Sequence, residues 1–191
     1  MKQKIAIIGT GNVGSALQKG LEKAGYEVRG AKKDQVMPSA EWADVILLAV
    51  PFGAVADVAR QISDAAIGKT IVDATNALTP DMQLAVGFTT SGAEELQKLL
   101  PRSNVVKSFN TVFAQHMSAG KVNGEQLTVF AAGDNEEARK TVLEMAKAVG
   151  FDAVDGGPLK NARFLEPFAY FNIQLGYVLG LGTNMGFRLV R

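Results

Sequence analysis

The chain of 191 residues contains no cysteine and a single histidine, His116. Without cysteine it cannot form disulfides, thiolate zinc sites, iron–sulfur clusters or a cysteine nucleophile. One histidine also excludes a multi-histidine metal site, so we expect no metal centre. His116 lies in the segment Ala114–Met117, and we interpret it as a structural or surface residue. Nothing in the sequence has the pattern of an acid–base dyad, so we expect no catalytic side chain.

An excess of charge of either sign is also absent. The chain has 20 Lys and Arg residues against 19 Asp and Glu residues, which gives a formal net charge of +1. It therefore lacks the broad basic field that attracts nucleic acid or anionic lipid, and we expect neither as a partner. An anionic ligand would have to be bound by local groups.

Long hydrophobic runs are missing as well. The apolar run Ile5–Ile8 ends at Gly9, too early for a secretory signal, and we expect a cytoplasmic protein. The most apolar stretch is Phe164–Leu181. It is not expected to span a membrane, because it contains the polar residues and proline Glu166, Pro167, Asn172 and Gln174.

The stretch Phe164–Leu181 has instead the spacing of a two-sided helix. One face would carry Phe164, Phe168, Phe171, Leu175 and Val178, and another Arg163, Glu166, Tyr170, Gln174 and Tyr177. This pattern predicts a core helix, with a subunit contact or a ligand wall as open alternatives. Further apolar residues lie outside the first face, and one small sheet would not cover them all. We therefore expect a homodimer that forms through the segment after Pro158.

Short β-branched runs alternate with helical patterns along most of the chain. The expected strands are Lys4–Ile8, Glu27–Arg29, Val45–Ala49, Thr70–Asp73, Val105–Ser108, Leu127–Ala131 and Asp152–Val154. The expected helices are Val13–Ala24, Ala54–Ala65, Gly92–Leu100 and Asn135–Val149. This alternation predicts an α/β fold with a doubly wound, Rossmann-type, mostly parallel sheet.

Two stretches depart from the alternation. The interval Ala31–Asp44 is short for a full crossover helix and predicts only a turn or two of helix. After Pro158 the strand signals stop and one long helical pattern remains. We therefore divide the chain into a dinucleotide-binding domain, residues 1–156, and a short C-terminal helical extension, residues 157–191, which we expect to supply an acceptor wall and the dimer contact.

The strongest functional motif is a glycine-rich turn that follows the first expected strand and opens the first helix. Its residues are Gly9, Thr10, Gly11, Asn12, Val13 and Gly14. Such a strand–turn–helix unit is typical of dinucleotide binding. The first glycine permits the turn, the second lets backbone approach a pyrophosphate, and the third lets helix and sheet pack closely. The free N–H groups of the helix N-terminus would hold the negative charge.

The cofactor is expected to be NADP(H) rather than NAD(H). NAD binders place an Asp or Glu at the end of the second strand, where it binds the ribose 2′-hydroxyl. This chain has Lys32 and Lys33 there, and no carboxylate before Asp34. Two ammonium groups could bind a 2′-phosphate through hydrogen bonds worth about 1.5–3 kcal/mol each, which favours NADP.

The third and fourth expected strands end in residues suited to the rest of the dinucleotide. Ala49–Pro51 follows one of these strands and Ala74–Ala77 the other. Carboxyl ends of parallel strands meet at one edge of a sheet, where doubly wound folds bind ligands. We expect Pro51 to form a wall against ribose or adenosine, and the amide of Asn76 to lie near the nicotinamide.

Together these residues resemble the NADP oxidoreductases that use the deazaflavin coenzyme F-420. The resemblance rests on the glycine turn Gly9–Gly14 and on four further segments, Ala49–Pro51, Val72–Asn76, Gly157–Leu159 and Ala162–Glu166. It implies pyrophosphate contacts from Thr10, Asn12 and Val13, 2′-phosphate contacts from Lys32 and Lys33, and a nicotinamide ribose bordered by Val50, Pro51 and Asn76.

This chain also departs from the deazaflavin family. The family has a histidine in the segment that matches Ser108–Val112, where this chain has Phe109 and Asn110. The segment Val105–Val112 resembles instead the NADPH-binding domains of the six-transmembrane ferric reductases. The acceptor therefore stays open between a deazaflavin, a flavin, a quinone and a ferric chelate.

The expected reaction is hydride transfer between the nicotinamide and a flat redox acceptor, most simply coenzyme F-420 or a flavin. We expect this acceptor to lie beside the nicotinamide, against Asn110, Thr111, Gly156, Gly157, Pro158 and Leu159. Pyrroline-carboxylate reductases and beta-hydroxyacid dehydrogenases begin similarly, but they append a large helical domain. The residues after Pro158 are too few for such a domain, which disfavours both families. A non-catalytic NADPH sensor is the remaining alternative.

Overall fold

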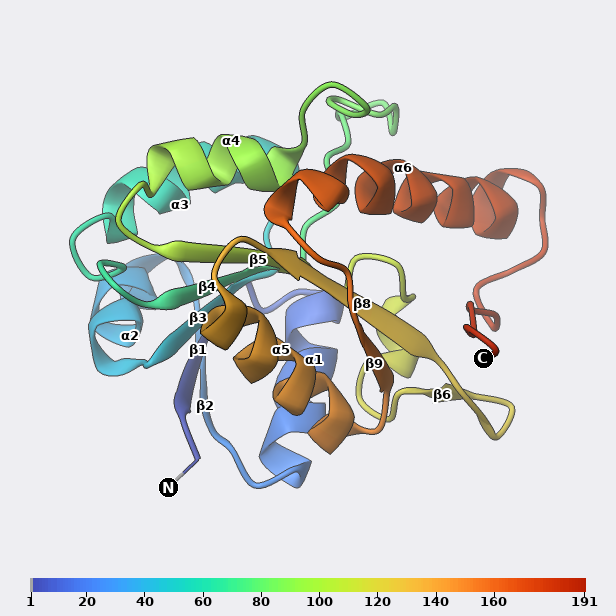
Figure 1. Cartoon of the computed structure of the whole chain (residues 1–191), viewed down its shortest axis with the longest axis horizontal. Helices are drawn as coiled ribbons and strands as arrows, with labels where there is room; N and C mark the ends of the chain where they lie inside the picture. The colour runs from blue at the N-terminus through green and yellow to red at the C-terminus, as the bar shows by residue number, and fades with distance from the viewer. Residues whose placement is uncertain (1) are drawn as a thin grey trace.

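The computed structural model describes residues 2–191 as a seven-stranded sheet with helices on both faces (Figure 1). The strands are β1 (Lys4–Ile8), β2 (Glu27–Ala31), β3 (Val45–Leu48), β4 (Thr70–Asp73), β5 (Asn104–Ser108), β8 (Thr128–Gly133) and β9 (Asp152–Asp155). Their spatial order is β2-β1-β3-β4-β5-β8-β9. A separate hairpin is formed by β6 (Lys121–Val122) and β7 (Glu125–Gln126).

The helices are α1 (Asn12–Lys23), α2 (Val36–Trp42), α3 (Phe52–Ile62), α4 (Gly92–Leu99), α5 (Glu136–Val149) and α6 (Ala162–Ile173). One core contains residues of α1 and α5 packed on one sheet face, and a second core contains residues of α2, α3 and α4 on the other. The predicted Rossmann-type α/β fold is confirmed. Among residues 2–191, no helix is both long and apolar enough to cross a membrane.

The central strands are apolar because both of their faces are covered. All four residues of β3, Val45–Leu48, have no exposed surface, and Ile5–Ile8 of β1 are at most 1% exposed. Strands buried on two sides cannot alternate apolar and polar residues, which is why these runs were readable in the sequence. The short interval after β2 forms one 3-10 turn, Lys33–Gln35, and the two-turn helix α2, as expected.

The sheet is not parallel throughout. Strands β1 to β5 are parallel, but β8 pairs with β5 in the antiparallel sense, and β9 then runs parallel to β8. The long connection from Phe109 to Leu127 contains the small hairpin and returns the chain so that β8 enters the sheet reversed. The sheet was predicted to be mostly parallel, and the antiparallel pairing of β8 with β5 is its one exception among the seven strands.

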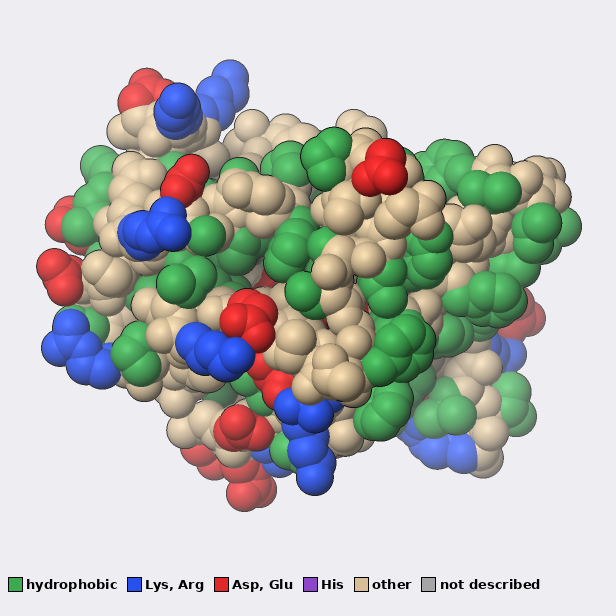
Figure 2. Space-filling view, turned by 90° about the horizontal axis from the view of Figure 1, so that it is seen from above, with side chains coloured by type: hydrophobic (Ala, Val, Ile, Leu, Met, Phe, Trp, Pro, Cys, Tyr) green, Lys and Arg blue, Asp and Glu red, His purple; other side chains and the backbone are tan. Residues whose placement is uncertain are grey.

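The C-terminal helix is shorter than its apolar pattern indicated and turns a different face to the core. Regular helix ends at Ile173 and a π-helical turn, Gln174–Val178, follows. The face expected to be buried is largely exposed, with Phe164 66%, Phe171 53% and Val178 67% accessible. The face against the protein carries instead Ala162, Glu166, Ala169, Asn172 and Ile173. Figure 2 shows hydrophobic side chains gathered over this part of the molecule.

Candidate functional site

The glycine turn has the geometry that each of its three glycines was expected to supply. Gly9 has a φ of +102°, and a Cβ there would lie 2.3 Å from the carbonyl oxygen of Ala49. A Cβ on Gly14 would lie 1.8 Å from the carbonyl oxygen of Gly9. A Cβ on Gly11 would meet nothing within 4 Å. Gly9 and Gly14 therefore serve the turn itself, whereas Gly11 faces open space in which a ligand could approach the backbone.

The N-terminus of α1 is open toward this space. Gly11 is the N-cap residue, and no side chain of the described chain caps the helix. Ser15 donates its hydroxyl to the carbonyl oxygen of Thr10 and so tightens the turn, with an oxygen–oxygen distance of 2.9 Å. The first N–H groups of a helix have no intrahelical acceptor, and the helix dipole favours negative charge there. These groups can hold a pyrophosphate.

A cavity of about 840 Å³ extends from the glycine turn across the carboxyl edge of the sheet. It is bounded by the turn, by the chain after β3 and by the segment after β4. Its lining includes six of the residues singled out from the sequence, namely Gly11, Asn12, Val13, Val50, Pro51 and Asn76. None of its lining side chains is ionisable. The structure thus brings together three segments that are far apart in the sequence.

Asn76 has an unusual environment at the wall of this cavity. Its Oδ1 atom is buried and has no hydrogen-bond partner among the described residues. A buried polar atom without a partner is costly, so a group that completes its hydrogen bonding is expected nearby. The cavity beside Asn76 is where a ligand amide or hydroxyl could supply that bond after a small rotation of the side chain. The residues present therefore fit a dinucleotide.

Lys32 and Lys33 follow β2 and are both exposed. Within residues 2–191, neither ammonium group takes part in an ion pair that would compete with a phosphate. Nearby, the guanidinium of Arg29 lies 3.8 Å from the ring centroid of Trp42, so the planar cation of this strand is already stacked. The two lysines are therefore free of competing ion pairs within the described residues.

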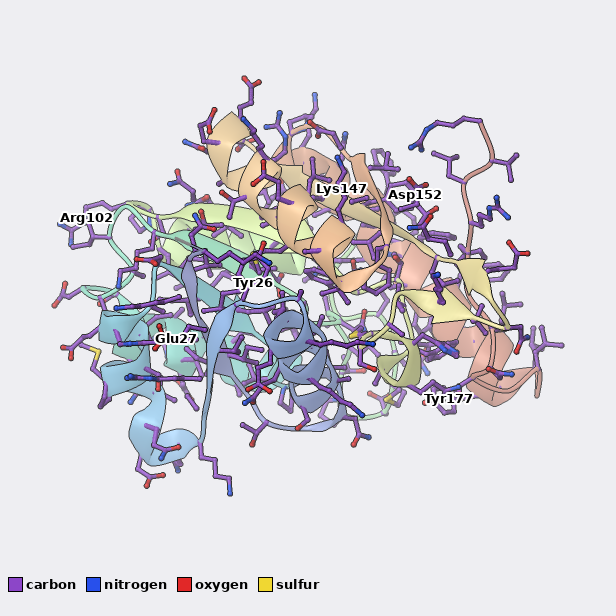
Figure 3. The ribbon with its side chains drawn as sticks, turned by 90° about the horizontal axis from the view of Figure 1, so that it is seen from below. Tyr26, Glu27, Arg102, Lys147, Asp152 and Tyr177 are labelled. Carbon is purple, nitrogen blue, oxygen red and sulfur yellow. The ribbon has the colours of Figure 1, made fainter. Side chains whose placement is uncertain are left out.

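A second cavity, of about 490 Å³, lies on the other side of the glycine turn. It shares Gly11 and Asn12 with the larger cavity and is also lined by Thr10, Ser15, Ala16, Phe113, Ala114, Gln115, Tyr177 and Thr183. The rings of Phe113 and Tyr177 meet edge to face with centroids 5.8 Å apart. Figure 3 shows Tyr177 at the far end of the molecule from Glu27 on β2. Phe113 of the loop after β5 and Tyr177 of the C-terminal segment thus lie in one cavity with the glycine turn.

The residues expected to contact the acceptor are not brought to either cavity. Asn110 is buried and donates from Nδ2 to the carbonyl oxygen of Leu165 at 2.9 Å. Thr111 is also buried, and its carbonyl oxygen accepts from Asn172. Leu159 is 2% exposed and belongs to the core under α4. These contacts fix the C-terminal helix to the loop after β5.

The loop Gly156–Leu159 lines neither of the two cavities. It follows β9, which runs opposite to β1–β5, so the chain leaves β9 heading away from the edge that holds the glycine turn. The loop is tied instead to the end of β8, where Gly133 donates to the carbonyl oxygen of Gly157 at 3.0 Å. A contact between this loop and an acceptor stays a prediction.

The sequence did not reveal a fully buried charge cluster beneath the site. Lys107 of β5 places its Nζ atom 2.9 Å from Asp73 Oδ2, 3.1 Å from Glu166 Oε1 and 2.7 Å from the carbonyl oxygen of Thr75. All three charged side chains are at most 1% exposed. One signal could have found the cluster: a lysine inside the apolar strand Asn104–Ser108 must have buried partners of opposite charge.

The partners of Lys107 also determine its protonation. Burial by itself would lower the pKa of the Lys107 ammonium, but the carboxylates of Asp73 and Glu166 outweigh burial and raise that pKa above its ordinary value. Lys107 is therefore a cation at neutral pH. Lys107 lines neither of the two cavities described above.

His116 is buried, and its Nε2 atom lies 3.0 Å from the carbonyl oxygen of Thr183. That contact joins the turn Ala114–His116 to the chain after α6. The structural interpretation of the histidine agrees with this position.

The fold and the glycine turn define the class of this protein as a Rossmann-type nucleotide-binding fold. Within that class it is similar to the NADP oxidoreductases that depend on coenzyme F420, whose family model matches residues 4–37 and 32–77. A solved structure from Arthrobacter sp. FB24, described provisionally as an F420-dependent NADP reductase, superimposes with a TM-score of 0.91 at 26% identity and covers 99% of this chain and 100% of its own. The resemblance expected from the sequence is confirmed.

Two curated relatives extend the comparison. Metalloreductase STEAP3 of Rattus norvegicus is 30% identical over 181 residues, 85% of this chain and 36% of its own length. The F420-dependent NADP reductase of Methanocaldococcus jannaschii is 27% identical over 157 residues, 78% of this chain and 66% of its own. This chain thus spans about a third of the first relative and about two thirds of the second. All three relatives are named as reductases, and two of those names include NADP.

Proposed function

We propose that this protein is an NADP(H)-dependent oxidoreductase that transfers a hydride between the nicotinamide and a flat redox acceptor. The observation that carries the proposal is the cavity that joins the open glycine turn to Asn76, whose buried Oδ1 atom has no hydrogen-bond partner among the described residues. Relatives named as NADP-dependent reductases support the same cofactor.

Each part of the site would hold a different part of the dinucleotide. The N–H groups at Gly11, Asn12 and Val13 would bind the pyrophosphate, and the ring of Pro51 would limit the movement of a ribose. Asn76 would hydrogen-bond the nicotinamide end. The bound nicotinamide supplies the hydride chemistry, while the protein supplies position and excludes water. A cavity wall without ionisable side chains suits such a transfer, since it needs no proton donor.

The choice of NADP(H) is tested at the two lysines. Replacing both Lys32 and Lys33 with Ala should weaken NADPH binding roughly tenfold or more, because charge-assisted bonds to the 2′-phosphate are worth about 1.5–3 kcal/mol each. NADH binding should stay nearly unchanged. Titration of both cofactors into both proteins by calorimetry measures this. Equal losses for NADPH and NADH would contradict the assignment.

The acceptor is proposed to approach from the second cavity, where Phe113 and Tyr177 provide aromatic surface next to the shared residues Gly11 and Asn12. A flat ring system gains from contact with such side chains. Tyr177→Ala should raise the KM for the acceptor and leave the dissociation constant of NADPH unchanged. An unchanged acceptor KM in this variant would place the acceptor elsewhere.

The class of acceptor is tested by NADPH oxidation with four compounds: the deazaflavin F-420, a free flavin, a quinone and a ferric chelate. Turnover with F-420 or a flavin is the expected result. The similarity to metalloreductase STEAP3 over 85% of the chain favours a second candidate, the reduction of ferric chelates. Binding of NADPH without turnover of any acceptor would favour a sensor instead.

A further inference from the structure

The buried cluster of Lys107, Asp73 and Glu166 connects the C-terminal helix to the cofactor cavity. We propose that Lys107 and Glu166 are positioning residues for the nicotinamide end of the NADP(H) site. They act by fixing the peptide that precedes Asn76, so that the C-terminal helix α6 takes part in cofactor binding without touching the cofactor. This inference rests on the proposed function, since it presumes that Asn76 faces the nicotinamide.

The turn that carries Asn76 is held by its predecessor, Thr75. The Oδ1 atom of Asp73 accepts hydrogen bonds from the backbone N–H of Thr75 at 3.0 Å and from its hydroxyl at 2.7 Å. Lys107 donates to the carbonyl oxygen of Thr75 at 2.7 Å and to Asp73 Oδ2 at 2.9 Å. Every polar group of Thr75 is thereby bound. The peptide plane that leads into Asn76 cannot rotate without breaking the bond to Lys107.

Glu166 completes the set of acceptors around Lys107. An ammonium group has three protons, and Asp73, Thr75 and Glu166 each offer one oxygen within 3.1 Å. With fewer acceptors the ammonium could rotate or shift. Glu166 thus limits the position of Lys107, and through it the position of Thr75 and Asn76.

Glu166 is itself fixed by the start of α4. Its Oε2 atom accepts from the backbone N–H of Gly92 at 2.8 Å, and its Oε1 atom from that of Ala93 at 3.1 Å. The cluster has two carboxylates and one ammonium, and the N–H groups at the helix N-terminus offset the surplus negative charge. The chain of contacts therefore begins at Glu166, which is fixed between α4 and α6, and ends at Asn76, whose Oδ1 atom has no partner among the described residues.

Helix α6 has other attachments that do not lead to Asn76. Arg163 forms a bidentate ion pair with Glu94, with distances of 2.7 and 2.9 Å to the two carboxylate oxygens. Asn110 and Asn172 add hydrogen bonds between the loop after β5 and the helix. Loss of the Glu166 charge therefore leaves α6 attached, and Arg163 offers a matched control on the same two helices.

The test compares NADPH with adenosine 2′,5′-bisphosphate, which has the adenine half of the cofactor but no nicotinamide. In Glu166→Gln, the dissociation constant of NADPH is expected to rise about three- to tenfold, as for one misplaced hydrogen bond. That of the bisphosphate should change by less than about twofold. In Arg163→Ala both constants should stay near those of the wild type. A purely structural role for Glu166 would weaken both ligands alike.

A double-mutant cycle then connects the effect to Asn76. Asn76→Ala should weaken NADPH, and adding Glu166→Gln to that variant should have little further effect. Lys107→Met should raise the dissociation constant of NADPH more than Glu166→Gln does. If the Lys107 variant does not fold, the cycle of Glu166 and Asn76 still decides the question. The inference would be overturned if the losses of NADPH affinity from Asn76→Ala and Glu166→Gln were additive. It would also be overturned if Arg163→Ala weakened NADPH as much as Glu166→Gln does. A wild-type protein that binds neither ligand would instead refute the proposed function.

Discussion

At the scale of single residues, the glycines of the turn have different roles: Gly11 borders open space where a ligand could bind, whereas Gly14 is packed against the backbone. Gly11→Ala should leave the melting temperature nearly unchanged, because its Cβ would meet nothing within 4 Å. The same methyl group would occupy the space that a pyrophosphate needs, so the affinity for both NADPH and NADH should fall. Thermal melts combined with titrations of both cofactors measure the two effects.

Gly14 provides the opposite case. A Cβ there would lie 1.8 Å from the carbonyl oxygen of Gly9 and 3.2 Å from Ile7, so helix α1 would have to move. Gly14→Ala should cost about 1–3 kcal/mol of unfolding free energy or more. If Gly11→Ala were as unstable as Gly14→Ala, the role of Gly11 would be structural.

At the scale of elements, the start of α6 is tied to the start of α4 by a titratable pair. The hydrogen bonds from Arg163 lower the pKa of the Glu94 carboxyl below its ordinary value of 4.5, and Ser91 contributes in the same direction. A depressed carboxyl pKa adds stability above the pKa of the unfolded chain, and this contribution disappears as the pH falls through the folded-state pKa.

Arg163→Ala should therefore lower the melting temperature slightly at pH 7, where Glu94 is ionised in both states. The difference from the wild type should shrink between about pH 5 and pH 3, as Glu94 gains its proton. Melting curves of the two proteins across this range measure the effect. A difference that stays constant with pH would mean that Arg163 acts through packing alone.

At the scale of the whole molecule, the apolar surface of the C-terminal segment is the main unexplained feature. Large side chains are exposed along α6 and the chain after it, among them Phe164, Phe171, Tyr177, Val178, Leu179 and Leu181 (Figure 2). A patch of this kind is typical of a subunit contact. We propose that a second copy of the chain covers it.

Sedimentation at micromolar concentration should therefore give about twice the chain mass of 20.3 kDa. Phe171→Glu should shift the protein toward the monomer, since a charge at a buried contact is costly. Leu99→Glu serves as a control, because Leu99 is also exposed, 39%, but lies on α4. A wild-type mass near 20 kDa would contradict the dimer.

Local chemistry explains what could be predicted from the sequence. The positions of β1 and β4 and the roles of Gly9, Gly11 and Gly14 follow from patterns within a few residues, such as continuous burial and the steric needs of a tight turn. The meeting of the glycine turn with Pro51 and Asn76 was also predictable, because parallel strands bring their carboxyl ends to one edge.

Only the tertiary structure decided the features that depend on distant partners. The direction of β8 follows from how the long connection after β5 returns to the sheet, and it sets the direction in which the chain enters the Gly156–Leu159 loop after β9. The face of α6 that is buried follows from Glu166, which contacts Lys107 and, 74 residues earlier in the chain, Gly92 at the start of α4. Periodicity counted Glu166 as polar and therefore outward, because a buried charge becomes tolerable only when its partners are in place.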